Sequence, residues 1–289
     1  MSERKETGEI TSYGLLSGEK LYQVRARQAL PILVRQAKAE QSIYYSDLAS
    51  ELGMPNPRNL NYVLGTIGNA LQALSKKWGI KAPPIQCLVI SMTTGIPGKG
   101  IGWFIDDKTF NSSSKRRKEI IIDRMLADIY NFTLWDKVLT EFSLKPLTNR
   151  PIRLMPIKAG AYGGVGESEE HRKLKAYIAK HPEIIKISKY ASSYIEYAFA
   201  SADIIDVLFQ HDNEWIGVEV KSARSGLEDI TRGLFQCIKY RALIEATQIS
   251  ENHHPNARVV LLLEDAFPKE LRWLKNILAV EVMDRISPK

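Results

Sequence analysis

In the second half of the chain, some segments place apolar residues at helical spacing and others have the pattern of strands, which predicts helices mixed with strands. Extended segments are expected at residues 194–199, 204–209, 215–220, 258–263 and 279–283, and helices at 167–180, 227–246 and 269–278. Helices that alternate with a small mixed sheet indicate an α/β sandwich.

The first half of the chain shows helical spacing followed by the outline of a helix-turn-helix. Apolar residues recur at helical intervals over 19–40, where Pro31 is expected to kink or split the helix. Ser46 is expected to cap a short helix that Gly53 ends, and a longer helix over 59–77 follows. The pair predicts a DNA-binding helix arrangement.

Two strands, 85–92 and 101–105, are expected to form a hairpin after this helix pair, because a Gly- and Pro-rich turn separates them. A hairpin in this place is the wing of a winged helix. Beyond it the polar stretch contains the basic run 115–118, which could touch phosphates or could be a solvated loop or the start of a helix, and a helical pattern spans 120–142.

Pro and Gly become frequent from residue 145 to residue 166, which marks a domain boundary. A chain of 289 residues is also long enough for two ordinary domains. We therefore expect a disordered tail at 1–18, a winged-helix-like domain with a helical extension at 19–145, a linker at 146–166 and a second domain at 167–289.

The helix-turn-helix region resembles the winged helix of alkylguanine-DNA alkyltransferases and alkyltransferase-like proteins. The residues that carry the likeness are Tyr45, Leu64, Gly65, Cys87 and Gly102. Where that family has Pro-Cys-His-Arg, residues 86–89 read Gln-Cys-Leu-Val, so the histidine that would activate the thiol is missing. The resemblance thus implies a DNA-binding shape without alkyl transfer, and Cys87 is expected to be a buried strand residue.

Charge is distributed unevenly between the two halves. Residues 1–150 carry 21 Lys and Arg against 14 Asp and Glu, whereas residues 151–289 carry 19 of each, so the whole excess of +7 lies in the first half. A basic excess suits a polyanionic partner, although many ordinary soluble proteins are as basic. The candidate DNA contacts are Arg58, Asn59, Asn61, Lys76, Lys77 and Lys99, the polar side chains facing a groove and the lysines facing phosphates.

Two candidate catalytic residues lie in the expected strand 216–221. Side chains of a strand alternate between its faces, so Glu219 and Lys221 emerge together on an exposed face while the valines beside them pack inward. Asp206 begins the preceding strand, and a hairpin between the two strands would bring it alongside Glu219. Two carboxylates suit Mg²⁺ or Mn²⁺, which polarises a phosphate and activates water, and Lys221 would position that water or stabilise developing negative charge.

This Asp, Glu-x-Lys pattern on adjacent strands resembles the PD-(D/E)xK nuclease superfamily, over residues 167–289. The resemblance implies a restriction-endonuclease-like α/β sandwich that hydrolyses phosphodiesters. It also implies that Gln236 and Tyr240, four residues apart on the following helix, form the Gln-x-x-x-Tyr element of recombination-type nucleases and orient Lys221 or the DNA. Arg232, one turn earlier, could reach a phosphate.

The superfamily's helical acidic residue is assigned to Glu170, with Glu167 as the alternative. A cluster of acids at the start of a helix is also explained by the helix dipole alone. Asp203 competes with Asp206 for the metal, and its position in a turn favours Asp206. His171, next to Glu170, could assist.

Together these features predict a Mg²⁺-dependent DNA endonuclease of restriction, phage defence or repair. The alternative is a non-catalytic DNA-binding regulator with a nuclease-like fold, and RNA is a second candidate substrate. The resemblance to these nucleases also implies a homodimer, because a duplex has two strands to cut. The sequence has no apolar run of membrane-spanning length, a charged start instead of an export signal, and two cysteines without metal or disulfide spacing, so we expect a cytoplasmic protein without a membrane partner.

Overall fold

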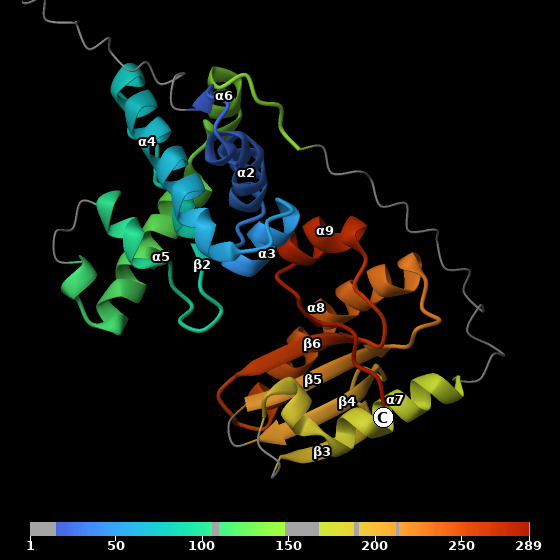
Figure 1. Ribbon diagram of the computed structural model, residues 1–289. Coiled ribbons are helices and arrows are strands. Elements are labelled where there is room, and N and C mark those ends of the chain that lie inside the picture. The colour runs from blue at the N-terminus through green and yellow to red at the C-terminus, as the bar shows by residue number, and fades with distance from the viewer. Residues whose placement is uncertain (1–15, 106–109, 148–167, 188–190, 212–213, 289) are drawn as a thin grey trace, which may run out of the picture. The chain divides into compact units, whose positions relative to one another are not determined.

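The structure, a computed structural model, describes residues 16–105, 110–147, 168–187, 191–211 and 214–288 (Figure 1). The chain divides into two compact units, Met1–Arg150 and Pro151–Lys289. The division falls inside the segment 146–166 expected as a linker. Most of that segment, most of the expected tail and Glu167 lie outside the described residues. No helix in the described part is long and apolar enough to cross a membrane.

The first unit is built from helices around one hydrophobic core. Its α-helices are α2 (Leu21–Lys38), α3 (Tyr45–Glu51), α4 (Leu60–Trp78), α5 (Lys115–Asn131) and α6 (Trp135–Glu141). α2 continues through Pro31 without a break and packs against α4. Gly53 follows the end of α3 with a φ of 63°, a left-handed backbone that glycine adopts without a steric penalty.

The prediction of a wing hairpin from strands 85–92 and 101–105 is wrong. Residues Ile85–Leu88 form a turn of 3₁₀ helix, and the strand β2 (Val89–Ile90) after it pairs in parallel with β1 (Ile43–Tyr44). The expected returning strand contains a second 3₁₀ turn, Lys99–Trp103. The reason is burial, because all four residues of the first 3₁₀ turn are buried, whereas a hairpin strand would expose alternate side chains.

Two helix boundaries also differ from the expectation. α3 begins at Tyr45 directly after β1, so Ser46 is not its cap. The expected helix over 120–142 is two helices, and the basic run 115–118 is the first turn of α5, where the Ser114 side chain accepts a hydrogen bond from the Arg117 backbone. Near the end of α5, the Trp135 indole N–H donates a hydrogen bond to the Ile129 carbonyl. Carbonyls of the last turn lack a partner within the helix, so this bond satisfies one of them.

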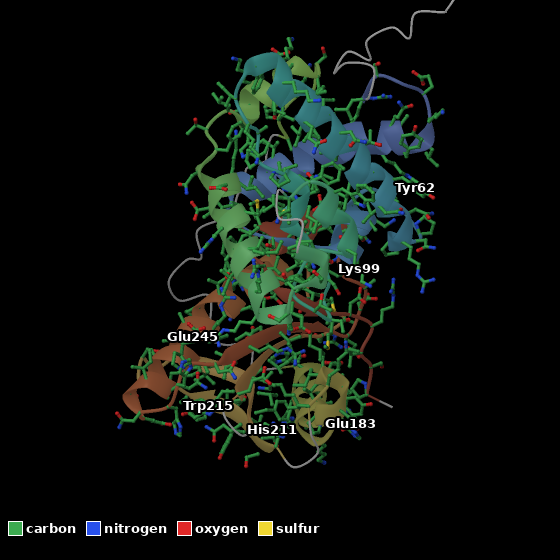
Figure 2. All side chains as sticks on the ribbon, turned by 90° about the vertical axis from the view of Figure 1, so that its left-hand side faces the viewer. Tyr62, Lys99, Glu183, His211, Trp215 and Glu245 are labelled. Carbon is green, nitrogen blue, oxygen red and sulfur yellow. The ribbon has the colours of Figure 1, made fainter. Side chains whose placement is uncertain are left out.

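The second unit contains a five-stranded mixed sheet in the order β3-β4-β5-β6-β7, and the expected mixed α/β class is confirmed. The strands are β3 (Ser192–Ala198), β4 (Ile204–His211), β5 (Glu214–Lys221), β6 (Ala257–Leu263) and β7 (Glu281–Met283). β3, β4 and β5 run antiparallel, whereas β5, β6 and β7 run parallel. His211 and Trp215 mark the hairpin end of β4 and β5, opposite to the end that carries Lys221 (Figure 2).

Helices cover both faces of this sheet (Figure 1). α7 (Glu169–Lys180) packs on one face, over a cluster that includes Phe209 and Val218. α8 (Leu227–Ser250) and α9 (Arg272–Ile277) pack on the other. Gly217 permits the close approach of α8, since a Cβ there would lie 3.0 Å from Ile244 Cδ1.

Phe209 of β4 is fully buried in the core that α7 covers, so Phe209→Ala should remove a large part of this core. We expect it to lower the free energy of unfolding by about 3–5 kcal/mol. Phe235→Ala on α8, where the ring is 41% exposed, is the matched control and should cost about 1 kcal/mol or less. Thermal and urea unfolding of the full chain measure both, and equal losses would contradict this packing.

Candidate active site

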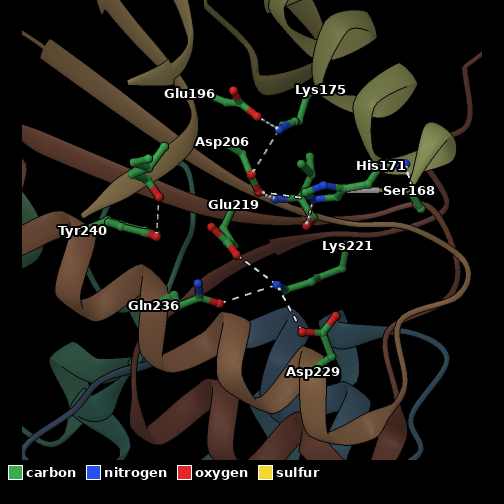
Figure 3. Close-up of polar contacts among 12 residues, drawn as sticks. Ser168, His171, Lys175, Glu196, Asp206, Glu219, Lys221, Asp229, Gln236 and Tyr240 are labelled. Atoms are coloured by element: carbon green, nitrogen blue, oxygen red, sulfur yellow. Dashed lines mark hydrogen bonds and ion pairs between the residues drawn. The ribbon is translucent and has the colours of Figure 1, made fainter. Parts of the chain in front are cut away.

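Lys221 is the centre of a polar cluster between β5 and α8 (Figure 3). Its ammonium donates to Glu219 Oε1 at 2.9 Å and to Gln236 Oε1 at 3.5 Å, and it lies 3.4 Å from Asp229 Oδ1. Glu219 is 4% exposed and Lys221 8% exposed. The expectation that these two side chains reach solvent is therefore wrong, because α8 covers the face from which they emerge.

Asp206 reaches this region through an irregularity in β4. Ile205 and Leu208 both belong to the cluster on the α8 face, whereas Val207 and Phe209 pack on the α7 face, so the alternation of faces shifts at Asp206. Opposite it on β3, Glu196 has a φ of 56°. Freed from regular pairing, Asp206 accepts a hydrogen bond from the Val220 backbone through Oδ2 at 2.8 Å.

α7 supplies two basic side chains to Asp206. His171 Nε2 lies 3.5 Å from Asp206 Oδ2 and 3.0 Å from the Val220 carbonyl. The Lys175 ammonium lies 3.9 Å from Asp206 Oδ1 and 2.5 Å from Glu196 Oε1, and the Lys175 side chain is buried. Asp206 therefore lies between the C-terminal end of β5 and α7.

The pKa values of Glu219 and Lys221 are both raised in this cluster, for different reasons. Burial and the nearby negative charge of Asp206 raise the pKa of Glu219 to about 7, against the smaller lowering effect of Lys221. Burial by itself would lower the pKa of Lys221, but Glu219, Asp229 and Asp206 outweigh it and raise that pKa. Lys221 is therefore charged at neutral pH, and the two carboxylates Asp206 and Glu219 repel each other.

The Gln-x-x-x-Tyr pair lies on the face of α8 toward the cluster. The Tyr240 hydroxyl donates to the Ile204 carbonyl at 2.6 Å and also shares a hydrogen bond with Gln236. Burial raises the pKa of Tyr240, so the hydroxyl stays protonated and keeps this donor role. Arg232 is paired with Asp229 at 3.4 Å, one turn before Gln236.

The two remaining acidic candidates have other partners. Glu170 Oε1 pairs with Arg224 Nη2 at 2.8 Å at the surface, and it is the next residue, His171, that contacts Asp206. Asp203 pairs with Lys239 at 2.7 Å and accepts a hydrogen bond from Ser201. These contacts favour Asp206 over Asp203 as the site carboxylate.

Sequence reasoning missed Lys175, Asp229 and Glu196. Helical spacing could have found the first two, because Lys175 lies four residues after His171 and Asp229 seven before Gln236. Glu196 belongs to the cluster because of the local irregularity of β3, and no pattern in the sequence predicts that irregularity.

The candidate DNA contacts of the first unit have mixed surroundings. Arg58, Asn61 and Lys99 line one pocket, whereas Lys77 is paired with Glu141 at 2.7 Å. Asn59 and Lys76 are exposed. Cys87 is buried, and burial raises the pKa of its thiol to about 12, which makes it a poor nucleophile.

Within the described residues, no group of three or more His, Cys, Asp and Glu side chains is arranged to hold a metal ion. Asp206 and Glu219 offer a smaller set of two carboxylates. Such a set fits Mg²⁺, which proteins hold through one or two carboxylates while waters and substrate phosphates complete the shell. Burial is the main cause of the raised Glu219 pKa, and repulsion from Asp206 adds to it; a cation between the two carboxylates would relieve that repulsion.

Comparisons with protein families, curated proteins and solved structures find no match to this chain. The function is therefore argued from the geometry and charge of the cluster alone.

Glu219→Gln should change how stability depends on pH. The folded state raises the Glu219 pKa from 4.5 to about 7, so Glu219 contributes stability below pH 4.5 that is lost as the pH rises through about 7. In chelator, the thermal stability of the wild type should therefore fall relative to Glu219→Gln between pH 5 and pH 8. Glu270→Gln, at an exposed position, should follow the wild type. Parallel pH profiles for the wild type and Glu219→Gln would contradict this picture of the site.

Proposed function

We propose that the second unit hydrolyses phosphodiester bonds of DNA with a divalent cation, Mg²⁺ or Mn²⁺. The observation that carries this proposal is the buried Lys221 ammonium 2.9 Å from the buried Glu219 carboxyl, with Asp206 close enough to raise the pKa of that carboxyl further. Buried ion pairs are poor sources of stability, because desolvation offsets their attraction. A carboxyl group whose pKa is raised as that of Glu219 is, next to a fixed ammonium, is in contrast typical of catalytic sites.

Each residue has a part in this reaction that follows from its contacts. Asp206 and Glu219 would hold the cation, which when bound polarises the phosphate and lowers the pKa of a water molecule. Lys221, fixed by oxygens of Glu219, Asp229 and Gln236, presents an ammonium to the attacking water or to the charge that develops on the phosphate.

Several residues position this machinery. Gln236 orients Lys221, and Tyr240 holds the α8 helix to β4 through the Ile204 carbonyl. His171 and Lys175 hold Asp206 from the opposite helix. The resemblance of Asp206, Glu219 and Lys221 to the PD-(D/E)xK pattern supports the same assignment.

DNA is the proposed substrate because the net charge of +7 lies entirely in residues 1–150. One cluster per chain can cut one strand at a time, so we expect two copies to act together on a duplex. Restriction, phage defence and repair all use such a reaction.

A non-catalytic DNA-binding regulator is the competing proposal. In that case the Glu219 and Lys221 pair would serve the fold only, and the wild type would show no cation-dependent cleavage of any nucleic acid.

Cleavage of supercoiled plasmid with Mg²⁺ and with chelator tests the proposal. Lys221→Met keeps the buried stem but removes the ammonium, and should slow cleavage about a hundredfold or more, which corresponds to about 2.7 kcal/mol of barrier. DNA binding, measured in chelator, should change far less. Lys173→Met, which removes an exposed lysine of α7, should cut at the wild-type rate.

Because Lys221→Met leaves Glu219 without its ammonium, the double variant Glu219→Gln/Lys221→Met, in which both partners are neutral, checks that loss of cleavage is not loss of folding. Cleavage by Lys221→Met at the wild-type rate would refute its assigned role. Cleavage of RNA but not DNA would refute the substrate, and a wild type inactive on both would favour the regulator.

A further inference from the structure

The Lys175 ammonium of α7 is buried between two carboxylates of neighbouring strands (Figure 3). It lies 2.5 Å from Glu196 Oε1 on β3 and 3.9 Å from Asp206 Oδ1 on β4, and its side chain is only 4% exposed. Lysine is rarely buried to this extent unless its charge is paired, because desolvation of an ammonium opposes folding. Lys175 therefore brings a fixed positive charge to the side of Asp206 that faces α7.

The acidic side chains of α7 take other partners. Glu169 and Glu170 form surface ion pairs with basic residues, at 2.7 Å and 2.8 Å. His171 and Lys175 are the α7 side chains that approach Asp206, at 3.5 Å and 3.9 Å. The helix thus supplies bases at the place where a further carboxylate would be needed to bind a further cation.

A position between two carboxylates is also one in which a protein can hold a divalent cation. Glu196 and Asp206 lie opposite each other in the pairing of β3 with β4. Two neighbouring carboxylates repel each other unless a positive charge lies between them, and the Lys175 ammonium supplies that charge. The same ammonium repels a divalent ion that approaches Asp206 from this side. Lys175 thus fills this position, and the side of Asp206 toward Glu219 remains for a cation.

We propose that the Lys175 ammonium takes the place of a second divalent cation, so that the cluster binds a single cation through Asp206 and Glu219. Hydrolysis of phosphate esters can use two cations roughly 3.5–4 Å apart, and here a residue of the chain takes the second position. Lys175 touches no reacting atom in this assignment and is a positioning residue that acts through Asp206. The inference rests on the proposed function, since it takes Asp206 and Glu219 as the cation ligands.

Binding of Mn²⁺ to the full chain counts the cations without any use of cleavage. It is measured in the absence of nucleic acid, by calorimetry and by the electron paramagnetic resonance of free Mn²⁺, at physiological ionic strength to weaken adventitious surface binding. The wild type should bind one Mn²⁺ per chain. Lys175→Ala removes the ammonium and leaves Glu196 and Asp206 facing each other, so it should bind two.

Three further variants identify the cause of such a change. Lys175→Ala/Glu196→Gln removes the carboxylate that the second cation needs, and should bind one Mn²⁺ again. Lys175→Arg keeps a positive charge between the two carboxylates and should also bind one. Lys173→Ala, at an exposed position of α7, is the matched control and should bind as the wild type. A role for Lys175 in the fold alone predicts the same count in every folded variant.

Two Mn²⁺ per chain in the wild type would overturn this inference and leave the proposed function standing. The same holds for one Mn²⁺ in Lys175→Ala that circular dichroism shows to be folded. The wild-type count needs no variant, so it decides the matter even if Lys175→Ala does not fold. A wild type that binds no Mn²⁺ would overturn the proposed function and this inference with it.

Discussion

The burial of charge between β5 and α8 is the constraint on which the arrangement of the second unit depends. A buried ammonium is tolerated only with partners, and Lys221 takes them from its own strand and from α8. This requires α8 to lie close to the sheet, and Gly233 permits it, because a Cβ there would lie 2.9 Å from Lys221 Cε and 2.8 Å from Leu261 Cδ1. The same helix buries Glu219 and the Lys221 ammonium, and a buried charge interaction is stronger than one in water.

The second carboxylate makes the cluster electrostatically incomplete. Burial and then the charge of Asp206 raise the pKa of Glu219 to about 7, although Lys221 acts in the opposite direction. The chain places Asp206 nearby at the cost of the regular alternation of β4, and holds it with His171 and Lys175 from α7. Two helices on opposite faces therefore meet around the end of one strand pair, where a substrate phosphate and a cation could both gain access.

Sequence periodicity predicted the order of elements and the shared face of Glu219 and Lys221, because alternation along a strand depends only on local geometry. It could not predict that this face is covered, since coverage depends on where α8 packs. The choice of Glu170 as the helical acidic residue depended on the rotational phase of α7, which a few residues near a helix start do not determine; in the structure it is His171 that contacts Asp206. In the first unit, an apolar run after two prolines predicts a strand, but the run forms a 3₁₀ turn that buries all four of its residues, and this burial depends on packing that the local sequence does not determine.

Both units contain buried polar groups that their own residues do not fully satisfy, and the difference between them is informative. Burial and the charge of Asp206 oppose ionisation of Glu219, whereas the Gln86 amide has no hydrogen-bond partner among the described residues. Natural sequences depart from local stability rules mainly where function requires it. A ligand that satisfies such a group binds the folded state alone and so returns the stability that the unsatisfied group costs.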